Sequence, residues 1–323
     1  MMHNMPKVTI AMAVYKPDLF FFKQQLESID SQDYDNLELL IWNDSPSDFD
    51  CRKYVSQYMT RVSYRILDNG KNNGVTLAFE HLTKAADGEY IAYCDQDDIW
   101  LHDKVSKSIA FLENHPECAC CHCECQLIDD NDRVIRNKIY PASLDIVNNE
   151  AYQKKTFFVK NWGVGCAMTM PNVVAKSALP FPTMVFHDQW LEMFALTMGK
   201  FYYMPQLLIK HRIHGTNNSQ TLHGVSTKED YYRLKLEKEV KFYAFLQERL
   251  SFWQEYQDIG KWIQAREKYA KNPGLISFLG LLPWIGVRPG VTLFELLIPL
   301  IPNKMFSAIL NLIRKEVRKF DIR

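Results

Sequence analysis

Residues 88–100 read GEYIAYCDQDDIW, and this stretch decides the fold. An apolar run from Tyr90 to Cys94 leads directly into the acidic loop of residues 95–98. Such a run is typical of a strand buried on both faces of a sheet. In open α/β sheets, ligands bind beyond the carboxyl ends of the strands, where this loop begins. The stretch therefore predicts a sheet with a ligand site at its edge.

The acidic loop is the sharpest chemical feature. Three carboxylates within four residues repel one another unless a cation lies among them. Oxygen ligands on a short loop suit Mg²⁺ or Mn²⁺, held together with substrate phosphates. The alternative is a solvated turn that caps a helix near residue 103. Ile99 and Trp100 follow at once and disfavour that alternative.

Working outward, apolar runs of strand length alternate with helical patterns over the first 125 residues, which predicts a parallel sheet covered on both faces. Short strands and turns dominate from about residue 118 to 185, and Gly199 ends a helix that contains Trp190. The predicted strands are Val8–Val14, Leu37–Trp42, Val62–Leu67 and Tyr90–Cys94, and the predicted helices are Leu19–Ile29, Val75–Ala86 and Lys104–Leu112.

The chain changes character after about residue 222, so we expect a catalytic α/β domain over 1–222 and a helical region over 223–323. Residues 226–229 form a capping-box pattern before a long amphipathic helix, and Gly260 is a candidate break. Residues 275–313 combine apolar runs, prolines and basic residues. They indicate either a helical subdomain or an in-plane membrane anchor, and we favour the membrane surface.

Charge and cysteine content narrow the functional class. The 323 residues include 38 basic and 38 acidic side chains, so no general field attracts nucleic acid. The opening residues MMHNMPKVTIAMAVY lack a secretory pattern, which predicts a cytoplasmic protein with eight reduced cysteines. The cysteines of segment 118–125, with His122, predict a buried strand more than a zinc site, because zinc usually needs a second, distant ligand pair.

The acidic stretch resembles the metal-binding segment of family 2 glycosyltransferases with the GT-A fold, a Rossmann-like mixed sheet that binds nucleotide-diphospho-sugars. The DQDDIW form is similar to bacterial rhamnosyltransferases of surface polysaccharides. The resemblance spans roughly residues 6 to 220 and rests on further segments in order: VTIAMAVYKP, LLIWNDSPSD, KNNGVTLAFEHL, HDQWLEMFALTMGK and IKHRIHGTNNS. Departures are Asn43 and Ser45-Pro46 in the second segment, and Phe79 where many relatives carry arginine.

The resemblance assigns roles that the residues alone leave open. Without it, Tyr15 could be a core residue, Asp44 a turn residue, Asp188 a helix cap and His214 a surface histidine. With it, the catalytic base is Asp188; the nucleotide and donor side is Tyr15, Asp44, Asn72, Gly74, Asp95, Gln96 and Arg212; the acceptor side is Asp98, His187 and Trp190; and the metal ligands are Asp97 and His214.

The implied activity is a metal-dependent inverting transfer of a sugar from a nucleotide-sugar donor. We expect dTDP-rhamnose as donor, with a UDP-hexose or UDP-N-acetylhexosamine as the alternative. The acceptor would be a lipid-linked bacterial surface glycan, reached from the inner face of the cell membrane. The competing interpretation is a non-catalytic protein that only binds nucleotide sugars.

Overall fold

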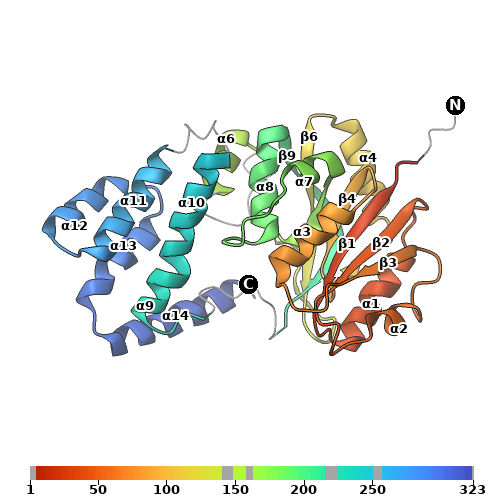
Figure 1. Ribbon diagram of the computed structural model, residues 1–323, viewed down its shortest axis with the longest axis horizontal. Helices are drawn as coiled ribbons and strands as arrows, with labels where there is room; N and C mark the ends of the chain where they lie inside the picture. Colours follow the sequence, from red (N-terminus) through yellow and green to blue (C-terminus); the bar gives the residue numbers. More distant parts are fainter. Residues whose placement is uncertain (1–4, 140–147, 158–162, 215–223, 250–256, 322–323) are drawn as a thin grey trace. The chain divides into compact units, whose positions relative to one another are not determined.

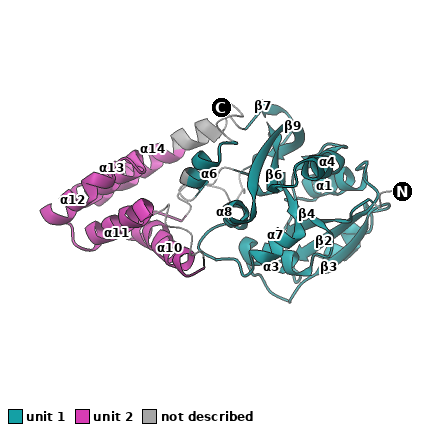
Figure 2. Cartoon of the chain, turned by 90° about the horizontal axis from the view of Figure 1, so that it is seen from above, with its two compact units in different colours: residues 1–215 teal, residues 216–323 magenta. Residues whose placement is uncertain are grey.

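The computed structural model describes residues 5–139, 148–157, 163–214, 224–249 and 257–321. The chain divides into two compact units, residues 1–215 and 216–323 (Figure 2). The division lies close to the boundary that the sequence predicts between residues 222 and 223. None of the described helices is both long enough and apolar enough to cross a membrane.

A mixed nine-stranded sheet forms the centre of the first unit (Figure 1). Its order is β3-β2-β1-β4-β8-β6-β9-β5, with β7 paired to β6. Strands β1 to β4 are parallel to one another, whereas β8 runs antiparallel to β4 and β6. The bounds are β1 Val8–Val14, β2 Leu37–Asn43, β3 Ser63–Leu67, β4 Tyr90–Cys94, β5 Ile99–Trp100, β6 Cys118–Ile128, β7 Val134–Arg136, β8 Met168–Pro171 and β9 Lys200–Arg212.

Helices cover both faces of this sheet. Phe22 and Leu26 of α1 and Ile109 of α4 pack in one core with the inner side chains of β1 and β2. Helix α3 contacts β1 and β2 and also meets α7 and α8. This cover explains why β1 and β2 are buried along their whole length. The bounds are α1 Leu19–Asp30, α2 Cys51–Val55, α3 Val75–Ala85, α4 Lys104–Asn114, α6 Glu150–Phe157, η1 Gly165–Ala167, α7 Asn172–Ser177 and α8 His187–Met198.

The predicted alternation up to residue 114 is confirmed, and each of the predicted strands and helices is present within two residues. The region after residue 118 differs from the prediction, because β6 and β9 are long strands of 11 and 13 residues. The segment 118–125 is part of β6, and all its cysteines are buried free thiols. The cysteines of this segment therefore belong to a strand of the core, as the sequence predicts.

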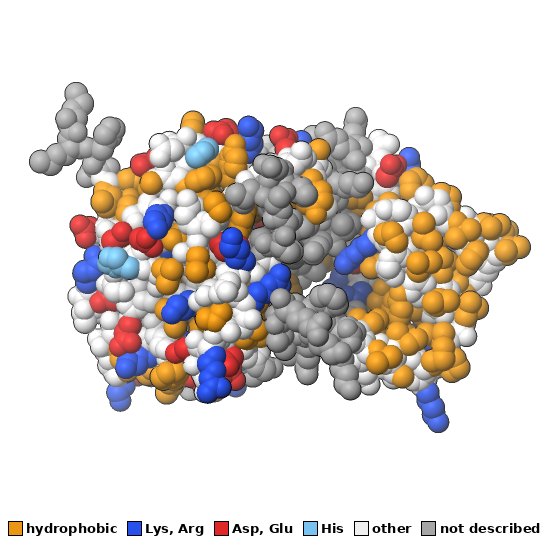
Figure 3. Space-filling view, turned by 180° about the vertical axis from the view of Figure 1, so that it is seen from behind, with side chains coloured by type: hydrophobic (Ala, Val, Ile, Leu, Met, Phe, Trp, Pro, Cys, Tyr) orange, Lys and Arg blue, Asp and Glu red, His pale blue; other side chains and the backbone are white. Residues whose placement is uncertain are grey.

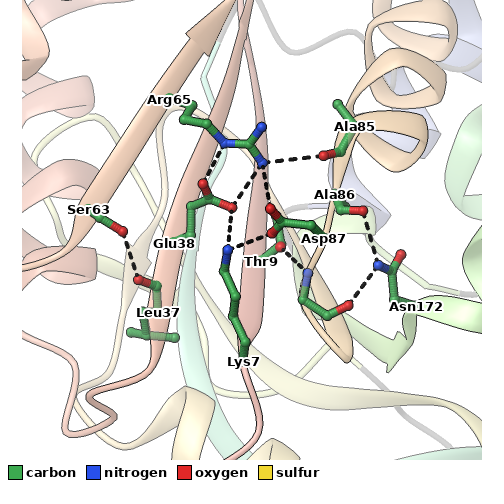
Figure 4. A network of polar contacts seen from close by, with 11 residues as sticks. Lys7, Thr9, Leu37, Glu38, Ser63, Arg65, Ala85, Ala86, Asp87 and Asn172 are labelled. Atoms are coloured by element: carbon green, nitrogen blue, oxygen red, sulfur yellow. Dashed lines mark hydrogen bonds and ion pairs between the residues drawn. The ribbon is translucent and has the colours of Figure 1, made fainter.

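A polar network at the amino ends of the parallel strands ties them together (Figure 4). Lys7 Nζ lies 2.6 Å from Asp87 Oδ1 and 3.3 Å from Glu38 Oε2. Arg65 contacts the same two carboxylates. The network lies at the edge of the sheet opposite to the acidic loop, so it stabilises the scaffold without taking part in the site.

The second unit is helical. Its first helix is capped by a box between Thr227 and Asp230, one residue later than the predicted pattern. Gly260 does not break a helix, which corrects the prediction: a Cβ there would lie 1.8 Å from Tyr243 Oη, so the glycine lets α11 pack against α10. The bounds are α9 Lys228–Tyr231, η2 Tyr232–Leu236, α10 Glu237–Arg249, α11 Gln257–Lys271, α12 Leu275–Leu281, η4 Leu282–Trp284, α13 Pro289–Leu297, η5 Ile298–Leu300 and α14 Asn303–Asp321.

Candidate active site

The acidic loop connects β4 to the short strand β5, which pairs with β9. This pairing brings the end of β9, residues 209–212, beside the loop although more than a hundred residues separate them. The backbone N–H of Arg212 donates to Asp98 Oδ1 at 2.9 Å. The loop is therefore held by β9 at its last residue, in addition to its connection to β4.

Asp98 and His211 form a buried ion pair under the loop. His211 Nδ1 lies 2.8 Å from Asp98 Oδ1, and Cys166 Sγ lies 3.6 Å from the same ring nitrogen. Burial opposes both charges, but the Asp98 carboxylate raises the pKa of His211 well above its ordinary value. Conversely, burial alone would raise the pKa of Asp98, and the charge and hydrogen bond of His211 lower it. Each partner thus favours the charged form of the other.

Asp97 and His214 form a second, more accessible pair. His214 Nε2 lies 2.8 Å from Asp97 Oδ2, and both side chains are partly exposed. The hydrogen bond to Asp97 raises the pKa of His214. The two residues that the sequence predicts as metal ligands thus lie together at the surface of the loop.

Asp95 lies close to the buried pair, with one carboxylate oxygen within 4.8 Å of donor atoms of Asp98 and His211. Desolvation, and then the charges of Asp98 and Asp97, raise the pKa of Asp95 well above its ordinary range. The charge of Asp188 contributes in the same direction. A Cβ on Gly165, the neighbour of Cys166, would lie 3.5 Å from Asp188 Cβ, which puts the predicted base near this group. Asp188 is the second residue of α8, and Phe186 occupies the N-cap position. It is therefore not the helix cap that its sequence position suggested as an alternative.

Gln96 fastens the loop to the end of β1. Its Oε1 accepts a hydrogen bond from the Tyr15 backbone N–H at 2.9 Å, and its Nε2 donates to the Tyr15 carbonyl at 3.2 Å. The Tyr15 ring is left exposed and available for stacking. Gln96 therefore positions Tyr15, and its amide is already engaged.

Asp44 fixes the segment before α3. Its carboxylate accepts hydrogen bonds from the backbone N–H groups of Asn73 at 2.7 Å and Gly74 at 2.9 Å. Gly74 has a φ of 79°, a conformation that favours glycine. Asn72 Oδ1 also accepts from the Gly74 N–H, and its side chain lies at the surface. Asp44 is buried, so the structure gives it an anchoring role that the sequence did not predict.

Arg212 does not face an open ligand position, which corrects the predicted contact with the diphosphate. Its side chain is fully buried, with the guanidinium 4.2 Å from the Phe21 ring. It donates to the carbonyls of Asp97 and Asp129 at 3.0 and 2.9 Å. A further ion pair joins it to Asp132 at 2.6 Å. The arginine holds the loop and the turn after β6 in place.

The three residues predicted on the acceptor side are also enclosed, so this part of the prediction is corrected. Asp98 is fully buried in its pair with His211. His187 stacks on Phe79 with ring centroids 3.7 Å apart. Trp190 is a core residue whose indole N–H donates to the Ala178 carbonyl at 2.9 Å. All three side chains are buried in the protein, in the acidic loop or in the first turn of α8.

The sequence analysis missed three residues around the loop. His211 and Cys166 complete the buried group, and Lys104 lies under the loop with its Nζ 3.7 Å from the centroid of the Trp100 ring. Lys104 is fully buried, and its ammonium has no hydrogen-bond partner among the described residues. Only the position of Lys104, six residues after the last residue of the loop, could have suggested it.

Two sets of side chains could hold a cation here. One donor atom from each of Asp95, Asp98, Cys166 and His211 lies within 4.8 Å of the others. Burial raises the pKa of the Cys166 thiol, and a protonated thiol is a poor ligand for a hard cation. The other set is Asp97 and His214, beside Asp95. Carboxylate oxygens open to phosphate fit Mg²⁺ or Mn²⁺ better than the buried set does.

The family model "Glycosyl transferase family 2" matches residues 14–179, which is just over half of the chain. The chain belongs to glycosyl transferase family 2. The matched region contains the ends of β1, β2 and β4 and the whole acidic loop. The matched range thus includes most of the candidate site residues but ends before Asp188 and His214.

Known relatives and solved structures agree with this assignment. Putative glycosyltransferase EpsE of Bacillus subtilis is 32% identical over 35% of this chain and 41% of its own. The UDP-Glc:alpha-D-GlcNAc-diphosphoundecaprenol beta-1,3-glucosyltransferase WfgD of Escherichia coli is 26% identical over 57% and 67%. S. aureus TarS 1–349 in complex with UDP-GlcNAc superposes with a TM-score of 0.58 at 15% identity, over 88% and 82% of the two chains.

A second solved structure is similar: the mannosyltransferase PcManGT of Pyrobaculum calidifontis, in complex with GDP-Man and Mn²⁺, has a TM-score of 0.50 at 14% identity over 91% and 84%. At such identities the likeness concerns the fold alone. The fold is GT-A, a mixed α/β sheet, and in this chain helices follow it at the C-terminus. The chain covers less than half of EpsE.

Proposed function

We propose that this protein is a metal-dependent inverting glycosyltransferase that uses a nucleotide-sugar donor to build a bacterial surface polysaccharide. The observation that carries the proposal is the position of Asp188 beside residues 165–166, since a Cβ on Gly165 would lie 3.5 Å from Asp188 Cβ. Cys166 in turn lies within 4.8 Å of donor atoms of Asp95 and Asp98. A base and an acidic metal-type loop in one site are the two parts that such a transfer needs. A protein that only bound nucleotide sugars would not need the base.

The donor would lie across the ends of β1, β2 and β4. The exposed ring of Tyr15 stacks on the base, and the surface residue Asn72 lies near the sugar. Asp44 acts mainly by holding Gly74 and its neighbours, and we keep its contact with the base as part of the proposal. Asp95 orients the ribose and the donor sugar. Asp97 and His214 would hold Mg²⁺ or Mn²⁺.

In the transfer step, Asp188 removes the proton from an acceptor hydroxyl. The acceptor oxygen forms a bond to the anomeric carbon from the face opposite the diphosphate, and the bond from that carbon to the diphosphate oxygen breaks. The nucleoside diphosphate leaves with both bonding electrons, and the configuration inverts. The bound cation would stabilise the charge that develops on the diphosphate. Because Arg212 is enclosed, the described residues leave this neutralisation mainly to the cation and His214.

Two donors are candidates. The DQDDIW sequence favours dTDP-rhamnose through the resemblance to rhamnosyltransferases. The names of WfgD and of the TarS complex favour UDP-glucose or UDP-GlcNAc. The lipid-linked acceptor in the name of WfgD supports an acceptor of the same kind here, at the inner face of the cell membrane.

The test is release of nucleoside diphosphate from purified protein across a panel of dTDP-, UDP- and GDP-sugars, with Mn²⁺ and with excess chelator. We expect one donor to turn over, and Asp97→Asn to slow it by about 10²-fold or more, because a metal contributes several kcal/mol of charge stabilisation. Tight binding of a donor without turnover, even with acceptor lipids present, would support the binding-protein alternative. Full turnover in chelator would refute the metal requirement.

A further inference from the structure

The second unit exposes an unusual number of large apolar side chains on its short C-terminal helices. Ile276, Leu275 and Leu300 are 80%, 74% and 73% exposed. Hydrophobic side chains gather over this part of unit 2 in the space-filling view (Figure 3). We call these residues the leucine face: Leu275, Ile276, Leu279, Leu282, Leu293, Leu297 and Leu300.

The leucine face is not needed to fold the unit, because the same helices bury other side chains. Thr292 of α13 accepts a hydrogen bond from Trp262 Nε1 at 2.8 Å. Glu295, one turn later, forms a buried ion pair with Arg266 at 2.6 Å. Leu281 and Leu296 pack inward as well. The inward-facing side chains of α12 and α13 are therefore packed or hydrogen-bonded. Their outward-facing side chains expose apolar surface to water, which raises the free energy unless a partner covers it.

The charges near the leucine face in the sequence are mainly positive, although Lys271 is paired with Glu267 at 2.6 Å. From Lys268 to Arg314 the sequence contains five basic residues and a single acid, Glu295. Glu295 is buried and paired, so it contributes no exposed negative charge. Lys304 at the start of α14 is exposed. An apolar surface with mainly basic residues beside it in the sequence complements an anionic lipid surface.

We propose that the leucine face docks in the plane of an anionic bilayer, with its side chains in the headgroup boundary. This deepens the membrane contact that belongs to the proposed function. Helices α12 and α13 have seven and nine residues, which is too short to span but suits an interfacial position. A second copy is a poorer occupant, because a two-fold interface would bring the basic residues of both copies together.

The experiment is co-sedimentation of the full chain with vesicles of phosphatidylcholine alone and of phosphatidylcholine with phosphatidylglycerol. We expect binding to the anionic vesicles that weakens as salt is raised. The double variant Ile276→Glu/Leu297→Glu is expected to weaken it at least ten-fold, and Lys304→Glu to remove part of the salt dependence. The matched control is Val173→Glu, at a 67% exposed position on α7 in unit 1, which should bind like the native chain.

Circular dichroism checks that each variant is folded, and light scattering reports the oligomeric state. The proposal is overturned if the native chain ignores anionic vesicles, or if the double variant binds them as well as Val173→Glu does. A dimer that the double variant abolishes, without vesicle binding by the native chain, would assign the face to a second copy. Donor turnover without acceptor is measured separately, so failure of lipid binding leaves the proposed chemistry untouched, and the reverse also holds.

Discussion

The proposed role of Asp188 as base can be separated from a structural role by one substitution. It stands in the first turn of α8 without being its N-cap, and its Oδ1 accepts the Gln189 N–H at 2.7 Å. Asparagine offers the same acceptor oxygen but cannot take a proton. We therefore expect Asp188→Asn to keep nucleotide affinity and lose less than about 1 kcal/mol of stability, the usual size of a helix-dipole effect. Transfer should fall by about 10²–10⁴-fold, the usual contribution of a general base.

The matched control for this variant is Asp87→Asn, in the network at the opposite edge of the sheet (Figure 4). It removes a carboxylate charge from the same unit and should leave transfer unchanged. Initial rates at saturating donor, with a thermal melt of each variant, provide the comparison. Near-native transfer by a stable Asp188→Asn protein would eliminate Asp188 as the base. Asp98 would then be a poor replacement, because its carboxylate is fully buried in the pair with His211.

His187 makes stability depend on pH. Burial against Phe79 lowers the pKa of its imidazole to about 3. Between about pH 6.5 and 3, this histidine is protonated in the unfolded chain but neutral in the folded chain. Its contribution to the free energy of unfolding is therefore full above about pH 6.5 and is lost as pH falls towards 3. The loss is about 1.4 kcal/mol per pH unit for this group. His122, whose pKa burial also lowers to about 3, adds a similar loss.

The variant His187→Phe keeps the stacking and removes the titration. Urea unfolding at several values between pH 6 and 4.5 should show a pH slope that is smaller than the native one by about 1.4 kcal/mol per unit. An unchanged slope would mean that the ring is already protonated, or solvated, in the folded protein.

At this scale the sequence predicts the candidates that a local motif carries. The acidic loop, Asp188 and His214 each lie in a short segment of recognisable spacing. The contact of His214 with Asp97 is present, and the roles of Asp188 and His214 stay predictions. The pair of Asp98 with His211 was not found, since 113 residues separate them and only the β5–β9 pairing joins them. Arg212 was misassigned for a related reason: its burial depends on Phe21, in a distant helix.

At the scale of elements, the close packing at the end of α8 gives a direct test of the fold. Gly199 follows this helix with an extended φ of 174°, so its backbone imposes no need for glycine. A Cβ there would instead lie 2.6 Å from the carbonyl oxygen of Glu117, ahead of β6. Because the obstacle is backbone, we expect Gly199→Ala to destabilise the protein by about 1–3 kcal/mol, as other overpacked sites do.

Gly290→Ala is the control for this substitution, because a Cβ there meets nothing within 4 Å and the residue lies in the first turn of α13. Alanine should be neutral or slightly stabilising at that position. Urea midpoints of the two variants provide the measurement. Equal stability of Gly199→Ala and the native chain would mean that α8 and β6 are not packed as closely as described.

The elements up to residue 114 were predictable because each is short, strongly periodic and buried by its neighbours in sequence. The long strands β6 and β9 were not, since their pairing joins residues about 80 positions apart and three register shifts interrupt the alternation of β6 up to residue 125. Gly260 shows the same limit. The sequence makes it a candidate helix break, but in the structure the absence of a Cβ leaves room for Tyr243, and no local pattern reveals that contact.

At the scale of the whole molecule, each unit has a hydrophobic core of its own. Val8, Phe22 and Ile109 belong to the core of the first unit, and Tyr231, Phe306 and Leu310 to a core of the second. The proposed nucleotide and metal residues all lie in the first unit. Binding stabilises only the states that bind, by RT ln(1 + [L]/Kd), which is about 2.7 kcal/mol when the ligand is at a hundred times its Kd.

We therefore expect a nucleoside diphosphate with Mn²⁺ to slow amide hydrogen exchange selectively. At a hundred times Kd, the central strands β1, β2 and β4 should exchange about 100-fold more slowly where exchange needs the unit to open. Helices α11 to α13 should be unchanged, because none of the proposed nucleotide and metal residues lies in the second unit. Peptide-resolved mass spectrometry measures both in one experiment, and Asp97→Asn with the same nucleotide serves as the control. Equal slowing in the two units would contradict independent cores, since a ligand held by one unit can protect the other only if they open together.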